Sequence, residues 1–140
     1  MAETPAPALA PRGQLVIRTI AMPADTNAAG DVFGGWLMSQ MDIGGAILAY
    51  QIARCRVTTV AVEAMTFHYP VLVGDTIACF AELQRVGRTS MRIHLEVWVQ
   101  RHFENTELRV TDGVFTYVAL DAACHPQPVY REGNPRPATL

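Results

Sequence analysis

The sequence predicts a single α+β domain in which an antiparallel sheet wraps around one long central helix. The stretch 23–53 opens as a polar, glycine-bearing turn and continues as roughly five turns of almost wholly apolar helix. A helix that is apolar nearly all round is normally buried by the rest of the fold. The β-rich segments that follow are joined by short connections, which favour antiparallel pairing.

The strands are expected at 15–21, 56–67, 76–86, 91–99 and 108–120. Strict alternation of apolar and polar residues makes 91–99 the clearest strand, and Gly113 predicts a bulge in the last one. Within the helix, Gly44 and Gly45 each cost about 1 kcal/mol relative to alanine, so they indicate close approach by another backbone. One helix covers only one face of a sheet, so exposed alternate residues such as Trp98 suggest association with another chain.

The length of 140 residues fits one domain with its own core. We expect residues 1–13, which are rich in Ala and Pro, to form a disordered or loosely docked leader. Residues 125–140 are expected to form a Pro-rich tail, which leaves 14–124 as the domain. The start lacks the basic and apolar character of a signal peptide, and no apolar run reaches membrane-spanning length.

The charge pattern argues against nucleic acid as a partner, and no segment points to a membrane. The chain has 11 basic and 13 acidic residues, a net charge of -2, and no run or stripe of basic residues. The cysteines, Cys55, Cys79 and Cys124, are odd in number and include no CxxC pair, which is typical of reduced thiols. The expected location is the cytoplasm.

One carboxylate, Asp42, interrupts the apolar helix. A buried aspartate is unfavourable unless it is paired, hydrogen-bonded or facing a cleft. Asp42 is therefore either a structural acid that caps or pairs inside a contact between chains, or a group that takes part in a reaction.

Four short motifs are present: MPADTN at 22–27, GDVFGGW at 30–36, MDIGGA at 41–46 and EVWV at 96–99. They resemble the YciA-type bacterial acyl-CoA thioesterases of the hotdog superfamily, and the similarity runs from about residue 15 to residue 129. The resemblance implies a hotdog fold and assembly into homodimers, commonly as hexamers of three dimers. It also implies hydrolysis of short- to medium-chain acyl-CoA to free acid and CoA, with no metal and no cofactor beyond the CoA of the substrate.

Thioester hydrolysis needs an activated water or nucleophile, and hydrogen-bond donors for the developing oxyanion. Asp42 can act as a general base on water or as a nucleophile that forms a mixed anhydride, and the sequence leaves both routes open. The first amides of the helix, at Gly34, Gly35 and Trp36, lack intrahelical partners and can hold the oxyanion. The alternative role of the two glycines is a tight turn.

Helix geometry separates these two groups. Gly35 and Asp42 are seven residues apart in the sequence, or about 10 Å along a helix, too far for both to act on one carbonyl. We therefore expect two antiparallel helices, each lending its amino-terminal amides to Asp42 of the partner. The site is then composite and the homodimer is required for activity, with Gly44 and Gly45 at a close helix or sheet contact.

Three polar residues near the helix are further candidates. Related enzymes have an asparagine where this chain has Asn27, whose amide can orient water or hold the thioester carbonyl; its alternative role is to form a turn. Asp31 is expected to cap the helix, and Thr66 to border the pocket from the end of its strand. The depth of the acyl pocket is expected to depend on Met38, Tyr50, Met65 and Phe67.

The turn at 85–90 is the candidate site for the phosphates of CoA. Its two guanidiniums and its backbone donors suit phosphate, and its members are Arg85, Gly87, Arg88, Thr89 and Ser90. The alternative is that these arginines are ordinary solvated surface residues.

Other hydrolytic and lyase chemistries find little support. The histidines, His68, His94, His102 and His125, lie outside the helix and not at metal-ligand spacing. Hotdog dehydratases pair a histidine with an acid on the helix, and this chain has no histidine in 23–53. The chain also has no GxSxG motif of the kind that a serine hydrolase carries. The remaining alternatives are a non-catalytic acyl-CoA binding or sensing module and a purely structural oligomer.

Overall fold

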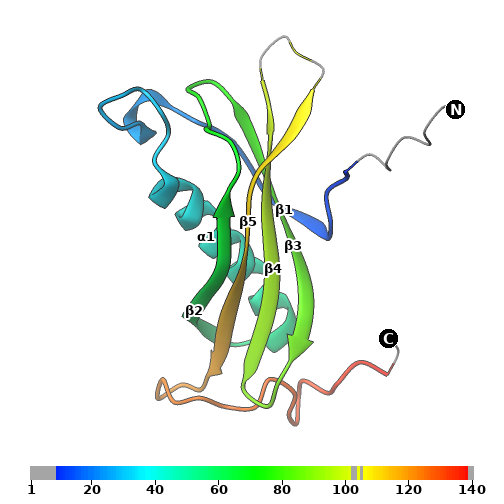
Figure 1. Cartoon of the computed structure of the whole chain (residues 1–140). Coiled ribbons are helices and arrows are strands. Elements are labelled where there is room, and N and C mark those ends of the chain that lie inside the picture. Colours follow the sequence, from blue (N-terminus) through cyan, green and yellow to red (C-terminus); the bar gives the residue numbers. More distant parts are fainter. Residues whose placement is uncertain (1–8, 102–103, 105, 139–140) are drawn as a thin grey trace, which may run out of the picture.

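The computed structural model describes residues 9–101, 104 and 106–138, so the predictions on 1–8, His102 and 139–140 fall outside it. The described elements are β1 (Gln14–Ile20), η1 (Pro23–Asp25), α1 (Gly34–Ala53), β2 (Arg56–Phe67), β3 (Thr76–Val86), β4 (Ser90–Gln100) and β5 (Glu107–Leu120). The strands form one antiparallel sheet in the order β1-β3-β4-β5-β2, and α1 lies across one face of it (Figure 1). The predicted α+β fold is confirmed.

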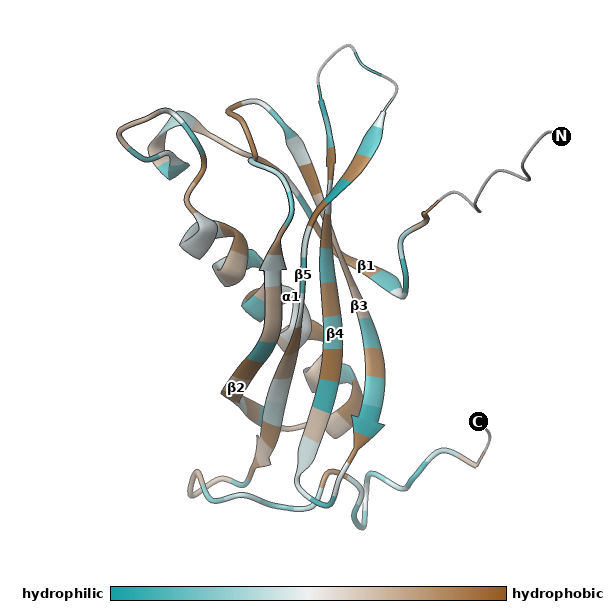
Figure 2. Cartoon of the chain, in the orientation of Figure 1, coloured by the Kyte–Doolittle hydropathy of each residue, from teal (hydrophilic) through white to brown (hydrophobic). Residues whose placement is uncertain are grey.

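The core lies between α1 and the sheet. The alternating residues of β4 that face α1 are each at most 2% exposed, and they are Met91, Ile93, Leu95, Val97 and Val99. Figure 2 shows the same alternation as hydrophobic and hydrophilic bands along this strand. Although α1 is rich in apolar residues, no helix in the described part of the chain is long and apolar enough to cross a membrane.

Gly44 and Gly45 allow side chains of the sheet to approach α1 closely. A Cβ on Gly45 would lie 2.1 Å from the Tyr117 hydroxyl, and one on Gly44 would lie 2.7 Å from Val16 Cγ2. The close contact is therefore with the sheet of the same chain and is made by side chains. The expected sheet contact is thereby confirmed, but side chains make it where another backbone was expected.

The irregularity near Gly113 lies in the neighbouring strand and not at the glycine itself. Gly113 pairs in register with Leu95 of β4, whereas β2 changes register between Glu63 and Thr66. A Cβ on Gly113 would lie 2.7 Å from the sulfur of Met65, which fills the space above it. The predicted bulge is thus in β2, and the glycine accommodates it.

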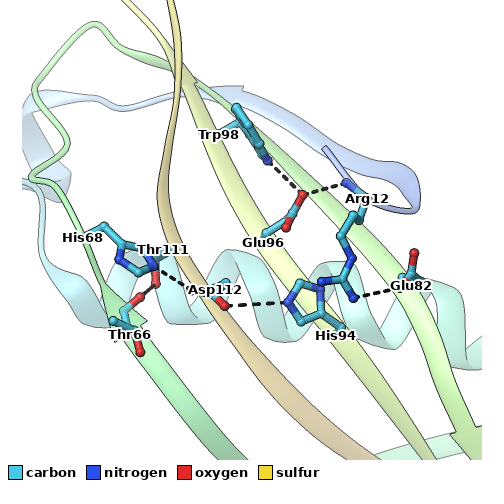
Figure 3. A network of polar contacts seen from close by, with 9 residues as sticks. All are labelled: Arg12, Thr66, His68, Glu82, His94, Glu96, Trp98, Thr111 and Asp112. Carbon is cyan, nitrogen blue, oxygen red and sulfur yellow. Dashed lines mark hydrogen bonds and ion pairs between the residues drawn. The ribbon is translucent and has the colours of Figure 1, made fainter. Parts of the chain in front are cut away.

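The sheet face away from α1 carries a buried polar network (Figure 3). Glu96 is 1% exposed and accepts hydrogen bonds from the indole of Trp98 at 2.9 Å and from the backbone amide of Arg12 at 2.6 Å. Because Trp98 is itself 5% exposed, the expectation that it lies free for association is wrong. Arg12 and Gly13, at the end of the leader, therefore lie against the sheet.

Residues after β5 pack against the domain and do not form a separate tail. Val129 is fully buried in the core. The guanidinium of Arg131 donates to the carbonyl of Ala53 at 3.0 Å, and Asn134 Nδ2 donates to the carbonyl of Ile52 at 3.0 Å. These bonds satisfy carbonyls at the end of α1 that have no intrahelical partner. The packed domain thus extends beyond the boundary predicted at 124.

β2 is the edge strand beside β5, and its other edge has no neighbour among the described residues. Most of its residues are exposed on both faces. Val60, Val62 and Phe67 are 55%, 39% and 48% exposed. An exposed apolar edge of this kind is a template for pairing with another strand.

Candidate active site

Asp42 is half-buried in the middle of α1, and its carboxylate reaches β2 and β5. The Thr59 hydroxyl donates to Oδ1 at 2.5 Å. The Tyr117 hydroxyl lies 2.8 Å from the backbone carbonyl of Asp42 and 3.3 Å from Oδ1. No described residue hydrogen-bonds Oδ2. One carboxylate oxygen is therefore anchored, while the other remains free for a water or a substrate.

Tyr117 reaches the helix backbone because Gly45 has no side chain at the point of contact. Burial, followed by the neighbouring charge of Asp42, raises the pKa of Tyr117 above its ordinary value. The hydroxyl therefore stays protonated near neutral pH and acts as a hydrogen-bond donor.

The start of α1 leaves two amides available. The helix begins at Gly34 after Phe33, which holds the N-cap position without a side-chain hydrogen bond. The Trp36 amide donates to the Phe33 carbonyl at 3.1 Å. It is therefore not the free donor that its predicted role in holding the oxyanion requires. The amides of Gly34 and Gly35 have no acceptor among the described residues. Both glycines are part of the helix, so the alternative role predicted for them, a tight turn, is not needed here.

Asp31 does not cap α1, so that prediction is wrong. It lies two residues before the N-cap position, in an extended segment that pairs with Leu72. Its backbone amide donates to the side chain of Asn27 at 3.1 Å. The helix start is therefore left open to other acceptors.

A hollow of about 330 Å³ lies beside this helix start. Gly34 and Leu37 of α1 line one side, and Phe67 and the residues after it line the other. A Cβ on Gly34 would lie 3.2 Å from the Phe67 ring, so the glycine keeps this hollow open. Phe67 is one of the residues predicted to shape the acyl pocket.

A single chain does not bring the amides and the carboxylate together. Gly35 and Asp42 both lie in α1, and seven helical residues span about 10 Å. The separation that predicts a composite site is therefore present in the structure.

Asn27 and Thr66 do not contact Asp42 within the chain. Asn27 Oδ1 accepts hydrogen bonds from the amides of Ala29 and Asp31, at 2.9 and 3.1 Å, which is the turn-forming role. Its Nδ2 has no acceptor among the described residues. Thr66 lies seven residues beyond Thr59 on β2, or about 23 Å along a strand. Thr66, expected to border the pocket from the end of its strand, directly precedes Phe67 of the hollow, whereas Thr59 of the same strand reaches Asp42.

The predicted CoA residues lie together on the β3–β4 connection, at the end of the sheet near the carboxyl end of α1. Gly87 donates its amide to the Ser90 carbonyl at 2.8 Å, so it is not a free donor. The carbonyls of Arg88 and Thr89 accept hydrogen bonds from the amides of Val129 and Ala119, each at 2.9 Å. This turn is therefore held by β5 and by the C-terminal segment, and its arginine side chains are exposed.

Two residues with a direct part in the site, Thr59 and Tyr117, are absent from the predicted set. Thr59 is one of two adjacent threonines. Which of them points at α1 depends on which face of the sheet each side chain of β2 occupies. Tyr117 lies 75 residues from Asp42 in the sequence. The glycine at 45 is the one signal in the sequence that a bulky group meets the helix there.

The thioesterase superfamily model matches residues 29–102 of this chain. The acyl-CoA thioester hydrolase YciA of Salmonella typhimurium is 54% identical over 126 residues, 88% of this chain and 95% of that protein. This chain belongs to the thioesterase superfamily, in its YciA group. The predicted family is confirmed.

Solved structures agree with this membership. A hexameric thioesterase from Yersinia pestis is 55% identical, with a TM-score of 0.82 over 85% of this chain and 98% of that one. A hexameric hotdog fold thioesterase of Campylobacter jejuni is 36% identical, with a TM-score of 0.80 over 86% and 92%. An acyl-CoA hydrolase from Staphylococcus aureus, solved with butyryl coenzyme A, is 28% identical, with a TM-score of 0.75 over 80% and 68%. The hotdog fold is thereby confirmed for the YciA-group chain described here.

Proposed function

We propose that this YciA-group chain hydrolyses acyl-CoA thioesters of short to medium chain length to the free acid and coenzyme A. The observation that carries the proposal is the geometry of Asp42. Thr59 holds Oδ1 at 2.5 Å, and Oδ2 is free of described partners. The activity of the relatives, and the butyryl-CoA complex of the Staphylococcus aureus hydrolase, support the substrate class.

In the proposed reaction, Asp42 removes a proton from water as the water oxygen attacks the thioester carbonyl. The resulting oxyanion accepts hydrogen bonds from the amides of Gly34 and Gly35 at the positive end of a helix. The carbon–sulfur bond then breaks, and the proton held by Asp42 passes to the thiolate of CoA. Direct attack by Oδ2, with a mixed anhydride that water then opens, uses the same groups. Neither route calls for a metal or a cofactor.

The two halves of this site come from two chains in our proposal. The separation of Gly35 from Asp42 along α1, about 10 Å, supports it. So does the exposed edge of β2, which is suited to pair with the same strand of a second copy and to bring two α1 helices together. The homodimer is then required for activity, and Asn27 Nδ2 remains available to a substrate in the loop before the helix.

The hexameric state of the Yersinia pestis and Campylobacter jejuni enzymes supports a hexamer of three dimers for this chain as well. The three cysteines are free, as is usual for proteins of a reducing compartment. We place the enzyme in the cytoplasm on that basis.

Release of free thiol from a panel of acyl-CoA esters tests the proposal. We expect wild type to hydrolyse short- and medium-chain esters, and Asp42→Asn to lose at least 100-fold in kcat, the order expected when an acid–base group is removed. Glu107→Gln, which neutralises an exposed carboxylate on β5, serves as the control and should match wild type. Equal rates for Asp42→Asn and wild type refute the role of Asp42. Binding of acyl-CoA without turnover by wild type indicates a sensing module instead.

A further inference from the structure

The connection between β2 and β3, residues 68–75, forms one wall of the hollow beside the start of α1. Four of its residues line the hollow, and they are His68, Tyr69, Pro70 and Val71. Loops are usually the more mobile part of a fold, so bonds to the sheet decide how firmly such a wall is held. The reaction proposed above uses the amides on the other side of the hollow and none of the residues in this wall.

Arg101, directly after β4, fastens this wall at two points. Its Nη2 donates to the backbone carbonyl of Pro70 at 3.1 Å, and its Nε lies 3.4 Å from Oδ2 of Asp75. The same Oδ2 accepts a hydrogen bond from the Leu72 amide at 2.9 Å. One side chain at the end of the sheet therefore holds both the middle and the end of the connection.

Asp75 is only 3% exposed, at the last position before β3. A buried carboxylate is strongly unfavourable unless it is paired and hydrogen-bonded. Among the described residues, the cation within ion-pair distance of it is Arg101, 26 positions away in the sequence. A turn needs only the bond from Asp75 to the Leu72 amide. The ion pair therefore serves to attach the wall to the end of β4.

The amino end of the wall is fastened separately, by β5. The His68 amide donates to the Val110 carbonyl at 2.7 Å, and His68 Nε2 lies 2.7 Å from Oδ1 of Asp112 (Figure 3). Loss of the Arg101 contacts would therefore loosen the wall at Pro70 and leave its amino end attached.

The hollow suits an alkyl chain. Its apolar lining residues are Val32, Leu37, Phe67 and Val71, together with the wall residues Tyr69 and Pro70. It lies beside Gly34, whose amide holds the thioester oxygen in the proposed reaction. An acyl chain that runs from the thioester carbon into the hollow gains apolar contact with the wall as it lengthens.

We propose that Arg101 and Asp75 are positioning residues that set the preferred acyl-chain length, because they fix how far the 68–75 wall stands from α1. The inference rests on the proposed function, since the acyl chain belongs to an acyl-CoA substrate. An acetyl group ends one carbon after the thioester carbon and makes the least contact with the wall. An octanoyl chain makes much more, so it reports on the position of the wall.

Kinetics on acetyl-CoA and octanoyl-CoA test the proposal. We expect Arg101→Gln to raise KM for octanoyl-CoA about 10-fold, the order expected when one or two methylene groups lose their contact with the wall. The value of kcat for both esters, and KM for acetyl-CoA, should stay at wild type. Asp75→Asn should act in the same way. Arg101→Lys keeps a cation beside Asp75 and should recover part of the wild-type KM.

The control is Arg18→Gln, which removes the same charge from an exposed position on β1 and should match wild type on both esters. An unchanged KM for octanoyl-CoA in Arg101→Gln overturns the proposal. An equal rise in KM for both esters also overturns it, because a general disturbance of the fold does not depend on chain length. If the unpaired Asp75 prevents Arg101→Gln from folding, the double variant Arg101→Gln, Asp75→Asn removes both charges and is held to the same outcomes.

Thioether analogues separate this proposal from the proposed function. S-ethyl-CoA and S-octyl-CoA keep the alkyl chain without a bond to hydrolyse, so calorimetric titration measures the wall without turnover. Weaker binding of S-octyl-CoA alone by Arg101→Gln, with no hydrolysis of any ester by wild type, refutes the proposed function and leaves the role of the pair intact. Hydrolysis by wild type, with equal binding of both analogues by the two proteins, overturns the role of the pair and leaves the function intact.

Discussion

The hydroxyl of Thr59 lies 2.5 Å from Oδ1 of Asp42, so a residue of the edge strand β2 holds the one carboxylate that interrupts α1. The strand that anchors Asp42 is also the strand whose outer edge is free. If that edge pairs with a second copy, the same strand both positions Asp42 and forms the contact between the two chains. The carboxylate and the proposed dimer contact are linked through one residue.

Replacement of Thr59 by valine keeps the branched shape and removes the hydroxyl. A hydrogen bond to a charged group contributes about 1.5–3 kcal/mol, so we expect kcat to fall about 10- to 100-fold with little change in KM. Thr58→Val is the matched control, because successive residues of a strand face opposite sides. Steady-state kinetics of the two variants on one acyl-CoA provide the comparison, and equal kcat values would show that Thr59 does not position Asp42.

Alkaline pH should destabilise the fold through two buried groups. Burial raises the pKa of Cys79 from 9.0 to about 12 and also raises the pKa of Tyr117 above 10.0. Both groups stay protonated in the folded state, whereas the unfolded chain releases their protons above pH 9 and pH 10. The stabilisation that these two groups give the fold is therefore fully present below pH 9. It is lost as pH rises, by up to about 1.4 kcal/mol per pH unit for each group.

Urea unfolding at pH 8, 9.5 and 10.5 checks this expectation. The Cys79→Ala, Tyr117→Phe double variant should be less stable than wild type at pH 8, and its free energy of unfolding should fall less steeply with pH. Parallel pH dependences for the two proteins would exclude these residues as the source.

Asn134→Ala should lower the free energy of unfolding by about 1–3 kcal/mol, because carbonyls at the end of α1 lose a buried donor. Asn134 Nδ2 lies 3.0 Å from the Ile52 carbonyl, 3.2 Å from that of Ala53 and 2.7 Å from that of Val129. Glu132→Ala, at an exposed position in the same segment, is the control and should leave stability unchanged. Equal stability of the two variants would mean that the C-terminal segment is only loosely attached.

Local patterns are enough to predict the layers of this fold. Alternation along β4 and the apolar run of α1 are set by neighbouring residues, so the sheet, the helix and the separation of Gly35 from Asp42 follow from the sequence. The C-terminal segment is different. Its prolines suggest a tail, but Val129 is buried in the core and Asn134 bonds the carbonyls of Ile52 and Ala53, which lie 82 and 81 positions away. No local pattern contains such contacts.

The same limit applies to the site. Asp42 stands out because a carboxylate is unexpected on an apolar helix, and Gly45 stands out because it weakens that helix. The partners of Asp42 do not stand out, because threonine and tyrosine are ordinary residues in strands. Thr59 is missed because the orientation of the side chains of β2 depends on its register with β5, and that register shifts between Thr59 and Ala61.

The central claim is that one α1 supplies Asp42 and the partner's α1 supplies the amides. The most direct measurement mixes Asp42→Asn chains with Gly35→Pro chains and follows thiol release from acyl-CoA. Proline is tolerated in the first turn of a helix and removes the amide donor, and a Cβ at Gly35 meets no atom within 4 Å. Each variant alone should be inactive. After random exchange of subunits, half of the dimers are mixed and each holds one intact site, so activity should return to about a quarter of wild type. Exchange proven by mass spectrometry with no recovery of activity would contradict the account.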